Sequence, residues 1–135
     1  LKPGGWLAVW WGVYHDPTHP DPFDAATAHL FEGLEQSPRM AQGVPFALHA
    51  KARTGEMRKA GFVNVEHRAF VERRTFNAAQ IAALYESFSR VQIAPEATRR
   101  RLLAEAERIA ASRFGGQVVR EVVTSAFVGR RPWNV

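Results

Sequence analysis

The chain has 135 residues, of which 46% are hydrophobic and 23% are charged, with a formal net charge of +5 and no cysteine. This length suits one domain that buries about two thirds of its unfolded surface, and the composition excludes an intrinsically disordered chain. The lack of cysteine excludes a disulfide framework and a thiolate site, and it favours a reducing, cytoplasmic location.

The sequence shows no sign of a membrane or nucleic-acid partner. No apolar run approaches the roughly 20 residues that cross a bilayer, and no signal-peptide pattern is present. The basic residues are scattered, and the densest group, Arg99–Arg101, would point about 100° apart on a helix. We therefore predict a solvated helix face there, and rank binding of nucleic acid through these arginines as the last of three functions.

The first predicted element is a strand at Trp6–Val13, with the sequence WLAVWWGV. A short apolar run of this kind is typical of a central parallel strand buried on both faces. The next segment, residues 14–43, begins with a proline-rich irregular stretch and continues with AATAHLFEGLEQ, whose spacing predicts a helix. Asp24 is the expected N-cap of that helix.

Residues 45–60 predict a second helical region, which ends at Gly61 where a strand begins. The strand Val63–Val71 alternates apolar and charged residues, as an outer strand with one wetter face does.

A helical pair is predicted over residues 77–113. Asn77 is the expected cap of the first helix, and its apolar stripe consists of Ile81, Leu84, Tyr85 and Phe88. Pro95 begins the second helix, Gly115–Gly116 closes it, and a β-branched strand, VVREVVTSAFVGRR, follows. The order of elements predicts an α/β fold with three strands, the last of them antiparallel.

Several segments together resemble the C-terminal half of class I S-adenosylmethionine-dependent methyltransferases. They are LKPGG before a strand, GEMRKAGFVNVEHRAF, LYESFSRV, RRRLLAEAERIA and VVTSAFVGRRP. The resemblance is to the small-molecule branch called methyltransferase type 11, and YESFS followed by an arginine- and leucine-rich helix resembles its aconitate-methyltransferase-like group.

The resemblance implies a Rossmann-like sheet, of which residues 1–135 form the C-terminal portion. LKPGG would then lead from the fourth helix into the fifth strand. The family's glycine-rich loop and its acidic cofactor-binding residues would precede Leu1, and the absence of an initial methionine also favours a fragment. S-adenosylmethionine would be bound mainly by that missing half, and this part would be inactive alone. Gly4–Gly5 does not replace the loop, because a nucleotide loop follows a strand and opens a helix.

If the strands Trp6–Val13 and Val63–Val71 run parallel, both end at the edge where open α/β sheets bind ligands. Residues 14–43 and 77–113 would then converge as a cap over a small organic substrate. Methyl transfer needs alignment, exclusion of water and sometimes a base. The expected base is His15, and the expected substrate contacts are Trp11, Tyr14, Tyr85, Ser87 and Ser89.

Each of these residues also has a purely structural interpretation. Trp10 and Trp11 could pack in a core, Tyr85 and Phe88 could serve the apolar stripe, and Ser87 and Ser89 could bond back to helix carbonyls. Tyr85 and Ser89 would share a helix face, from which Ser87 points away.

No metal site is predicted. His15 and His19 have zinc-ligand spacing, but Pro17, Pro20 and Pro22 prevent the helix that would hold both rings on one face.

The alternative function is a free-standing α/β binding module without catalysis. Such a module could form a homodimer through its exposed strand edge.

Overall fold

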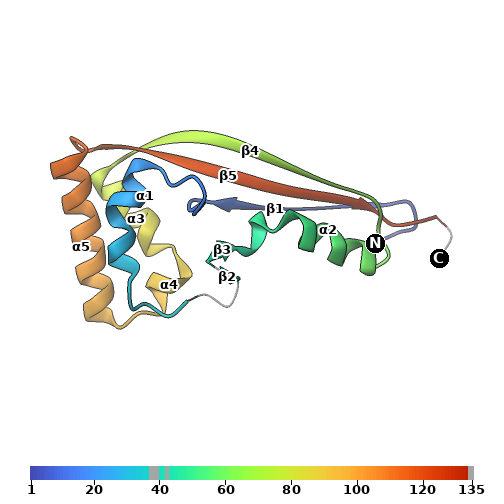
Figure 1. Ribbon diagram of the computed structural model, residues 1–135, viewed down its shortest axis with the longest axis horizontal. Helices are drawn as coiled ribbons and strands as arrows, with labels where there is room; N and C mark the ends of the chain where they lie inside the picture. Colours follow the sequence, from blue (N-terminus) through green and yellow to red (C-terminus); the bar gives the residue numbers. More distant parts are fainter. Residues whose placement is uncertain (37–39, 42, 134–135) are drawn as a thin grey trace. The chain divides into compact units, whose positions relative to one another are not determined.

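The computed structural model describes residues 1–36, 40–41 and 43–133, and the chain divides into two compact units. We call Leu1–Asp16, Ala41–Glu72 and Val122–Val135 the sheet unit. Pro17–Met40 and Arg73–Glu121 form the helical unit. Figure 1 labels the elements of both.

The principal sheet has three strands, β1 (Trp6–Val13), β4 (Val63–Asn77) and β5 (Gln117–Arg130), in the order β1-β5-β4. β1 is antiparallel to β5, with the register running from Trp6 opposite Arg130 to Val13 opposite Val123. β4 is also antiparallel to β5, since His67 contacts Ser125 whereas Arg73, further along, contacts Glu121. The fold is therefore mixed α/β with an antiparallel last strand, as predicted, and β1 and β4 run in the same direction (Figure 1).

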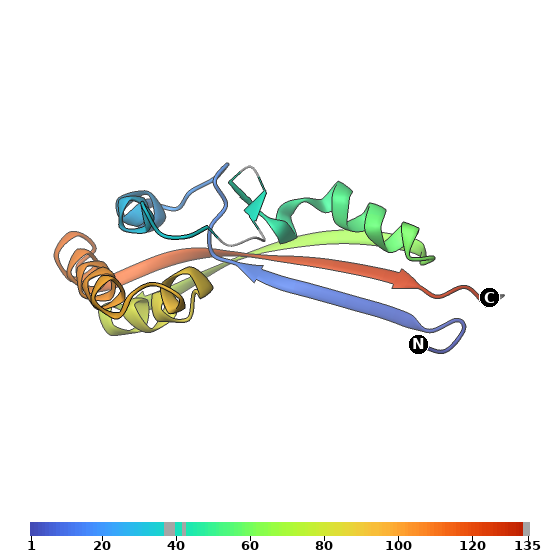
Figure 2. The same cartoon turned by 90° about the horizontal axis from the view of Figure 1, so that it is seen from below.

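A short strand pair and a helix lie between β1 and β4 in the chain. β2 (Met40–Ala41) pairs with β3 (Val44–Pro45), a 3-10 turn covers Phe46–Leu48, and α2 spans Ala50–Lys59. Figure 2 shows α2 over one face of the strands. Gly129 of β5 allows this approach, because a side chain there would meet Met57 of α2 at 2.8 Å.

The prediction that β1 is buried on both faces is wrong for this chain. Alternate residues are exposed along its length, and Trp6 and Trp10 are 54% and 67% exposed. Trp11, on the opposite face, is half-buried. The reason lies in the strand order: β1 is an edge strand, paired with β5 alone among the described strands.

The helical unit comprises α1 (Pro22–Thr27), a 3-10 turn (Ala28–Phe31), α3 (Ala78–Glu86), α4 (Ser89–Gln92) and α5 (Glu96–Arg113). Asn77 caps α3 as predicted, through a capping box with Gln80. The expected cap Asp24 is wrong, because Asp21 is the N-cap of α1 and accepts a hydrogen bond from the Asp24 amide. The core residues are Phe23, Ile81, Tyr85, Val91, Leu102, Ala106, Ile109, Ala110 and Val118.

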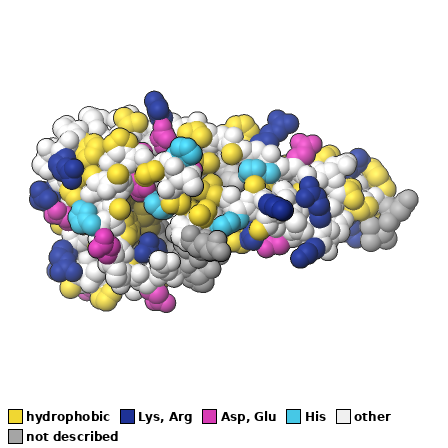
Figure 3. All heavy atoms as spheres, in the orientation of Figure 1, with side chains coloured by type: hydrophobic (Ala, Val, Ile, Leu, Met, Phe, Trp, Pro, Cys, Tyr) yellow, Lys and Arg dark blue, Asp and Glu magenta, His cyan; other side chains and the backbone are white. Residues whose placement is uncertain are grey.

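The arginines of α5 face solvent or neighbouring helix groups. Arg100 pairs with Glu96, Arg99 donates to the carbonyl of Gln92 at 3.4 Å, and Arg101 is exposed. On the face in Figure 3, Lys and Arg side chains are dispersed among acidic and hydrophobic ones.

The LKPGG turn is joined to the end of β5. Gly4 has a φ of 74° and its amide donates to the carbonyl of Arg131 at 2.9 Å, while the Arg131 amide donates to Gly5 at 2.9 Å. The ring of Trp133 lies where a Gly4 side chain would be, 2.4 Å from an ideal Cβ. The positive φ at position 4 therefore favours glycine, and a side chain there would also displace the exposed ring of Trp133.

We expect Gly4→Ala to lower the free energy of unfolding by more than Gly61→Ala does. Both residues have positive φ, so each alanine incurs about 1 kcal/mol of backbone strain, but nothing lies within 4 Å of a Cβ at Gly61. Only Gly4→Ala also displaces Trp133. Urea denaturation followed by tryptophan fluorescence measures both losses, and equal losses would contradict the contact.

Candidate functional site

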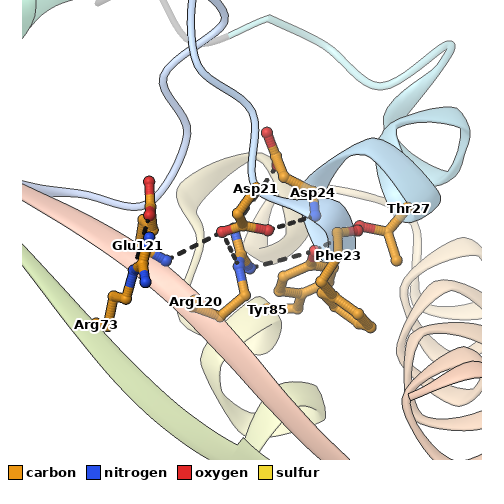
Figure 4. A network of polar contacts seen from close by, with 8 residues as sticks. All are labelled: Asp21, Phe23, Asp24, Thr27, Arg73, Tyr85, Arg120 and Glu121. Atoms are coloured by element: carbon orange, nitrogen blue, oxygen red, sulfur yellow. Dashed lines mark hydrogen bonds and ion pairs between the residues drawn. The ribbon is translucent and has the colours of Figure 1, made fainter.

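Arg120 of β5 is the centre of a buried polar network in the helical unit (Figure 4). Its side chain is 1% exposed, and its Nε donates to Oδ2 of Asp21 at 2.8 Å. One terminal nitrogen lies 3.7 Å from Oδ1 of Asp24, and the other lies 3.4 Å from the hydroxyl of Tyr85. A single guanidinium thus joins the segment after β1 to α3 and β5.

Asp21 uses both carboxylate oxygens. Oδ1 accepts from the amide of Asp24 at 2.7 Å and thereby caps α1. Oδ2 accepts from Arg120 and also from the amide of Glu121 at 3.1 Å. Pro22, at the start of α1, provides a φ that suits the first turn of the helix. Asp21 therefore begins a helix and fastens it to β5 at the same time.

Tyr85 completes the network through its hydrogen bond with Thr27. Thr27 Oγ1 donates to the carbonyl of Phe23 at 2.8 Å, so its contact of 2.6 Å with Tyr85 must be a hydrogen bond donated by the phenol. Burial raises the pKa of Tyr85, while the charge of Arg120 acts in the opposite direction. The phenol is thereby held protonated inside the core.

Rings and an outer ion pair surround the network. The guanidinium of Arg120 lies 5.7 Å from the ring centres of both Phe23 and Tyr85. Arg73 of β4 pairs with Glu121 at 3.0 Å on the exposed side of the same strands (Figure 4). Because its buried groups bond mainly to one another, the network acts as a structural joint between segments far apart in sequence.

The predicted site residues fall into two groups. Trp11, Tyr14 and His15 belong to the sheet unit and are half-buried at the end of β1 and just after it. Trp11 packs edge-on against Phe46 at 5.6 Å and Phe127 at 6.0 Å. Tyr85, Ser87 and Ser89 belong to the helical unit.

Of the helical-unit residues, Tyr85 is buried and hydrogen-bonded, whereas both serines are exposed. Ser87 donates to the carbonyl of Leu84 at 2.6 Å, which is the structural alternative given for it. The shared helix face of Tyr85 and Ser89 is wrong, because α3 ends at Glu86 and Phe88 is extended before α4 begins at Ser89. The roles of all these residues in substrate binding stay predictions.

Neither Arg120 nor Asp21 was among the predicted site residues. The sequence carries a signal for Arg120, because this charged residue sits between Val118 and Val122 in an alternating strand. Both valines are buried, so the arginine at the same phase must be buried too. A buried arginine requires an acidic partner, but nothing local selects Asp21, which is 99 residues away.

The Gly4–Gly5 turn does not fit a cofactor's phosphate or carboxylate group. Its two amides already donate to Arg131 and Lys2, and Trp133 covers Gly4.

Among the described residues, no group of three or more His, Asp or Glu side chains could hold a metal ion. No helix within those residues is long and apolar enough to span a membrane.

A scan against models of known protein families found no match, and a search of curated proteins found none either.

Replacing Asp21 should destabilise the helical unit in two steps. Asp21→Asn keeps a helix cap but leaves Arg120 without its closest carboxylate, and should cost about 3 kcal/mol. Asp21→Ala also removes the cap and should cost about 1 kcal/mol more. The control Glu121→Gln weakens the exposed pair with Arg73 and should cost less than about 1 kcal/mol. Chemical denaturation measures all three, and equal losses for Asp21→Asn and Glu121→Gln would refute a buried joint.

Tyr85 should make stability depend on alkaline pH. Its pKa is raised in the folded state above the ordinary value of 10.0, so its contribution is fully present below about pH 10. That contribution is lost as the pH rises through the raised pKa. Unfolding free energies measured from neutral pH to above pH 10 should fall more steeply for the wild type than for Tyr85→Phe. Parallel curves would show that the phenol is not held protonated.

Proposed function

We propose that this chain is the C-terminal part of an S-adenosylmethionine-dependent methyltransferase that acts on a small molecule. The observation that carries the proposal is topological. β1 and β4 run in the same direction, β5 lies antiparallel between them, and the long segments after β1 and β4 pack together in the helical unit. An open α/β sheet binds ligands beyond the ends of such strands.

The packing of the two segments supports a cap. Phe31 from the first segment contacts the ring of Tyr85 from the second at 5.2 Å, and Phe23 contacts Phe114 at 5.1 Å. Asp21 and Arg120 add the buried ion pair. Two segments held together in this way form one body. Such a body could cover a substrate and exclude water from the reaction.

The two outer strands of the sheet support a larger sheet beyond β1. β4 carries charged residues along its length and has a left-handed residue, Asn64 (φ 51°), both of which discourage pairing at an edge. β1 has no charge and no proline, and it exposes Trp6 and Trp10. A strand with these properties suits an interior position, with another strand at its edge and a helix over its exposed face.

The chemistry proposed for this chain is alignment and proton removal. The cofactor, bound mainly by another part of the enzyme, supplies an electrophilic methyl group. Trp11 and Tyr14 would contact the acceptor molecule, and His15 would accept a proton from its nucleophilic atom. Ser87 and Ser89 are exposed hydroxyl groups of the helical unit, for which the sequence predicts polar contacts with the substrate. Tyr85 would act by holding the cap together.

The bare edge of β1 also favours a second candidate, a binding module that pairs with another copy of itself. An isologous pair of β1 strands would bring no like charges together, because the strand is uncharged. In this case the partner of β1 is a second molecule, and no cofactor-binding part exists.

Titration calorimetry of the 135-residue chain with S-adenosylmethionine should show no binding, and tight one-to-one binding would contradict the assignment of the cofactor to another part. The coding sequence directly ahead of Leu1 decides between the two candidates. A glycine-rich strand–loop–helix there supports the methyltransferase. A start codon close upstream, together with a concentration-dependent dimer that Ala8→Lys abolishes, supports the module and overturns the first proposal.

A further inference from the structure

Arg53 of α2 holds an unusual position in the sheet unit. Its guanidinium carbon lies 3.6 Å from the centre of the Phe46 ring, so the cation sits directly on an aromatic face. One terminal nitrogen donates to Oε1 of Glu56 at 2.6 Å. The Nε atom and the other terminal nitrogen are buried, and neither has a hydrogen-bond partner among the residues that the structure describes.

Buried donors without partners are rare, because each loses its hydrogen bonds to water on burial and forms no hydrogen bond within the protein to compensate. A guanidinium carries five donors in one plane, and that geometry matches the oxygens of a carboxylate or a phosphate. Arg53 therefore has unused donors of the type that recognises oxyanions.

The neighbours of Arg53 hold these donors in place. Phe46 supports the guanidinium from one side and itself packs against Trp11 at 5.6 Å. The Arg53 side chain is only 13% exposed, whereas that of Glu56 is 59% exposed. The cation is thus fixed, and the carboxylate paired with it lies at the surface.

We propose that Arg53 is the anchor of an oxyanion-binding site, which takes the carboxylate of a small organic acid or a phosphate group. Glu56 occupies one donor and competes with the ligand, which enters when the exposed Glu56 side chain rotates away. Phe46 keeps the guanidinium plane oriented for the ligand. The site rests on contacts within the sheet unit and does not depend on the proposed methyl transfer.

The experiment follows the Nε–H resonance of Arg53 by NMR while the full chain is titrated with inorganic phosphate, acetate or benzoate. Ionic strength is matched with sodium chloride, so that general screening is the same in every arm. We expect a saturable shift of that resonance. Glu56→Gln should tighten binding several-fold because it removes the competing charge. A response to acetate or benzoate but not to phosphate identifies an organic acid, and the reverse identifies a phosphate group.

Two further variants separate the site from general charge attraction. Arg53→Lys keeps the charge but loses the planar donors, and should weaken binding about tenfold or more. Arg58→Lys, an exposed control on the same helix, should leave binding unchanged. The proposal is overturned if no anion gives a saturable shift in the wild type, or if Glu56→Gln binds no tighter. Both readings use chains that keep Arg53, so they hold even if Arg53→Lys unfolds.

Discussion

The helical unit depends on one buried positive charge. Arg120 projects from β5 into a core of aromatic and aliphatic side chains, where an unpaired guanidinium would be very costly. Asp21 and Asp24 supply the neutralising charge, and both belong to the segment that follows β1. A buried ion pair adds little net stability, but it strongly penalises any arrangement in which one partner is missing. The pair therefore selects where the first segment docks.

The same network links local and long-range structure. Asp21 is the N-cap of α1, so docking on β5 and starting the helix use the same side chain. Tyr85 then connects α3 to α1 through Thr27, and the rings of Phe23 and Phe31 pack against it. In the proposed methyltransferase, this joint would hold together a cap built from two segments that are far apart in sequence.

In the sheet unit, the notable feature is an apolar strand, β1, that lies at the edge of the sheet. β1 is apolar on both faces, as an interior strand is, yet in this chain it lies at the edge of the sheet and exposes two tryptophans. β4, the other edge, is charged and interrupted by Asn64. The contrast between the two edges is the main support for the proposal that this chain belongs to a larger sheet.

Local signals in the sequence predicted several elements, but β4 continues to Asn77 instead of ending at Val71, and the helix predicted in AATAHLFEGLEQ is α1 (Pro22–Thr27) followed by a 3-10 turn. The limits of β1, the cap at Asn77 and the turn at Gly61 follow from periodicity, side-chain capping and backbone freedom. The prediction that β1 is buried failed because the burial of a strand depends on which strands are its neighbours. The prediction of one continuous helix through Ser89 failed because the apolar stripe in the sequence continues through Phe88, although the backbone of Phe88 is extended. Arg120 and Asp21 were not paired in advance because residues far apart in sequence give no local sign of contact.

The central claim is that the segment after β1 and the helices after β4 form one cooperative body through Arg120. Native-state hydrogen exchange, resolved by residue and measured at increasing low concentrations of denaturant, tests it most directly. The account predicts that α1 amides such as Ala25, bonded to the Asp21 carbonyl at 3.0 Å, open with the same free energy and denaturant dependence as those of α3 and α5. Exchange of α1 by an independent, denaturant-insensitive opening of much lower free energy would contradict it.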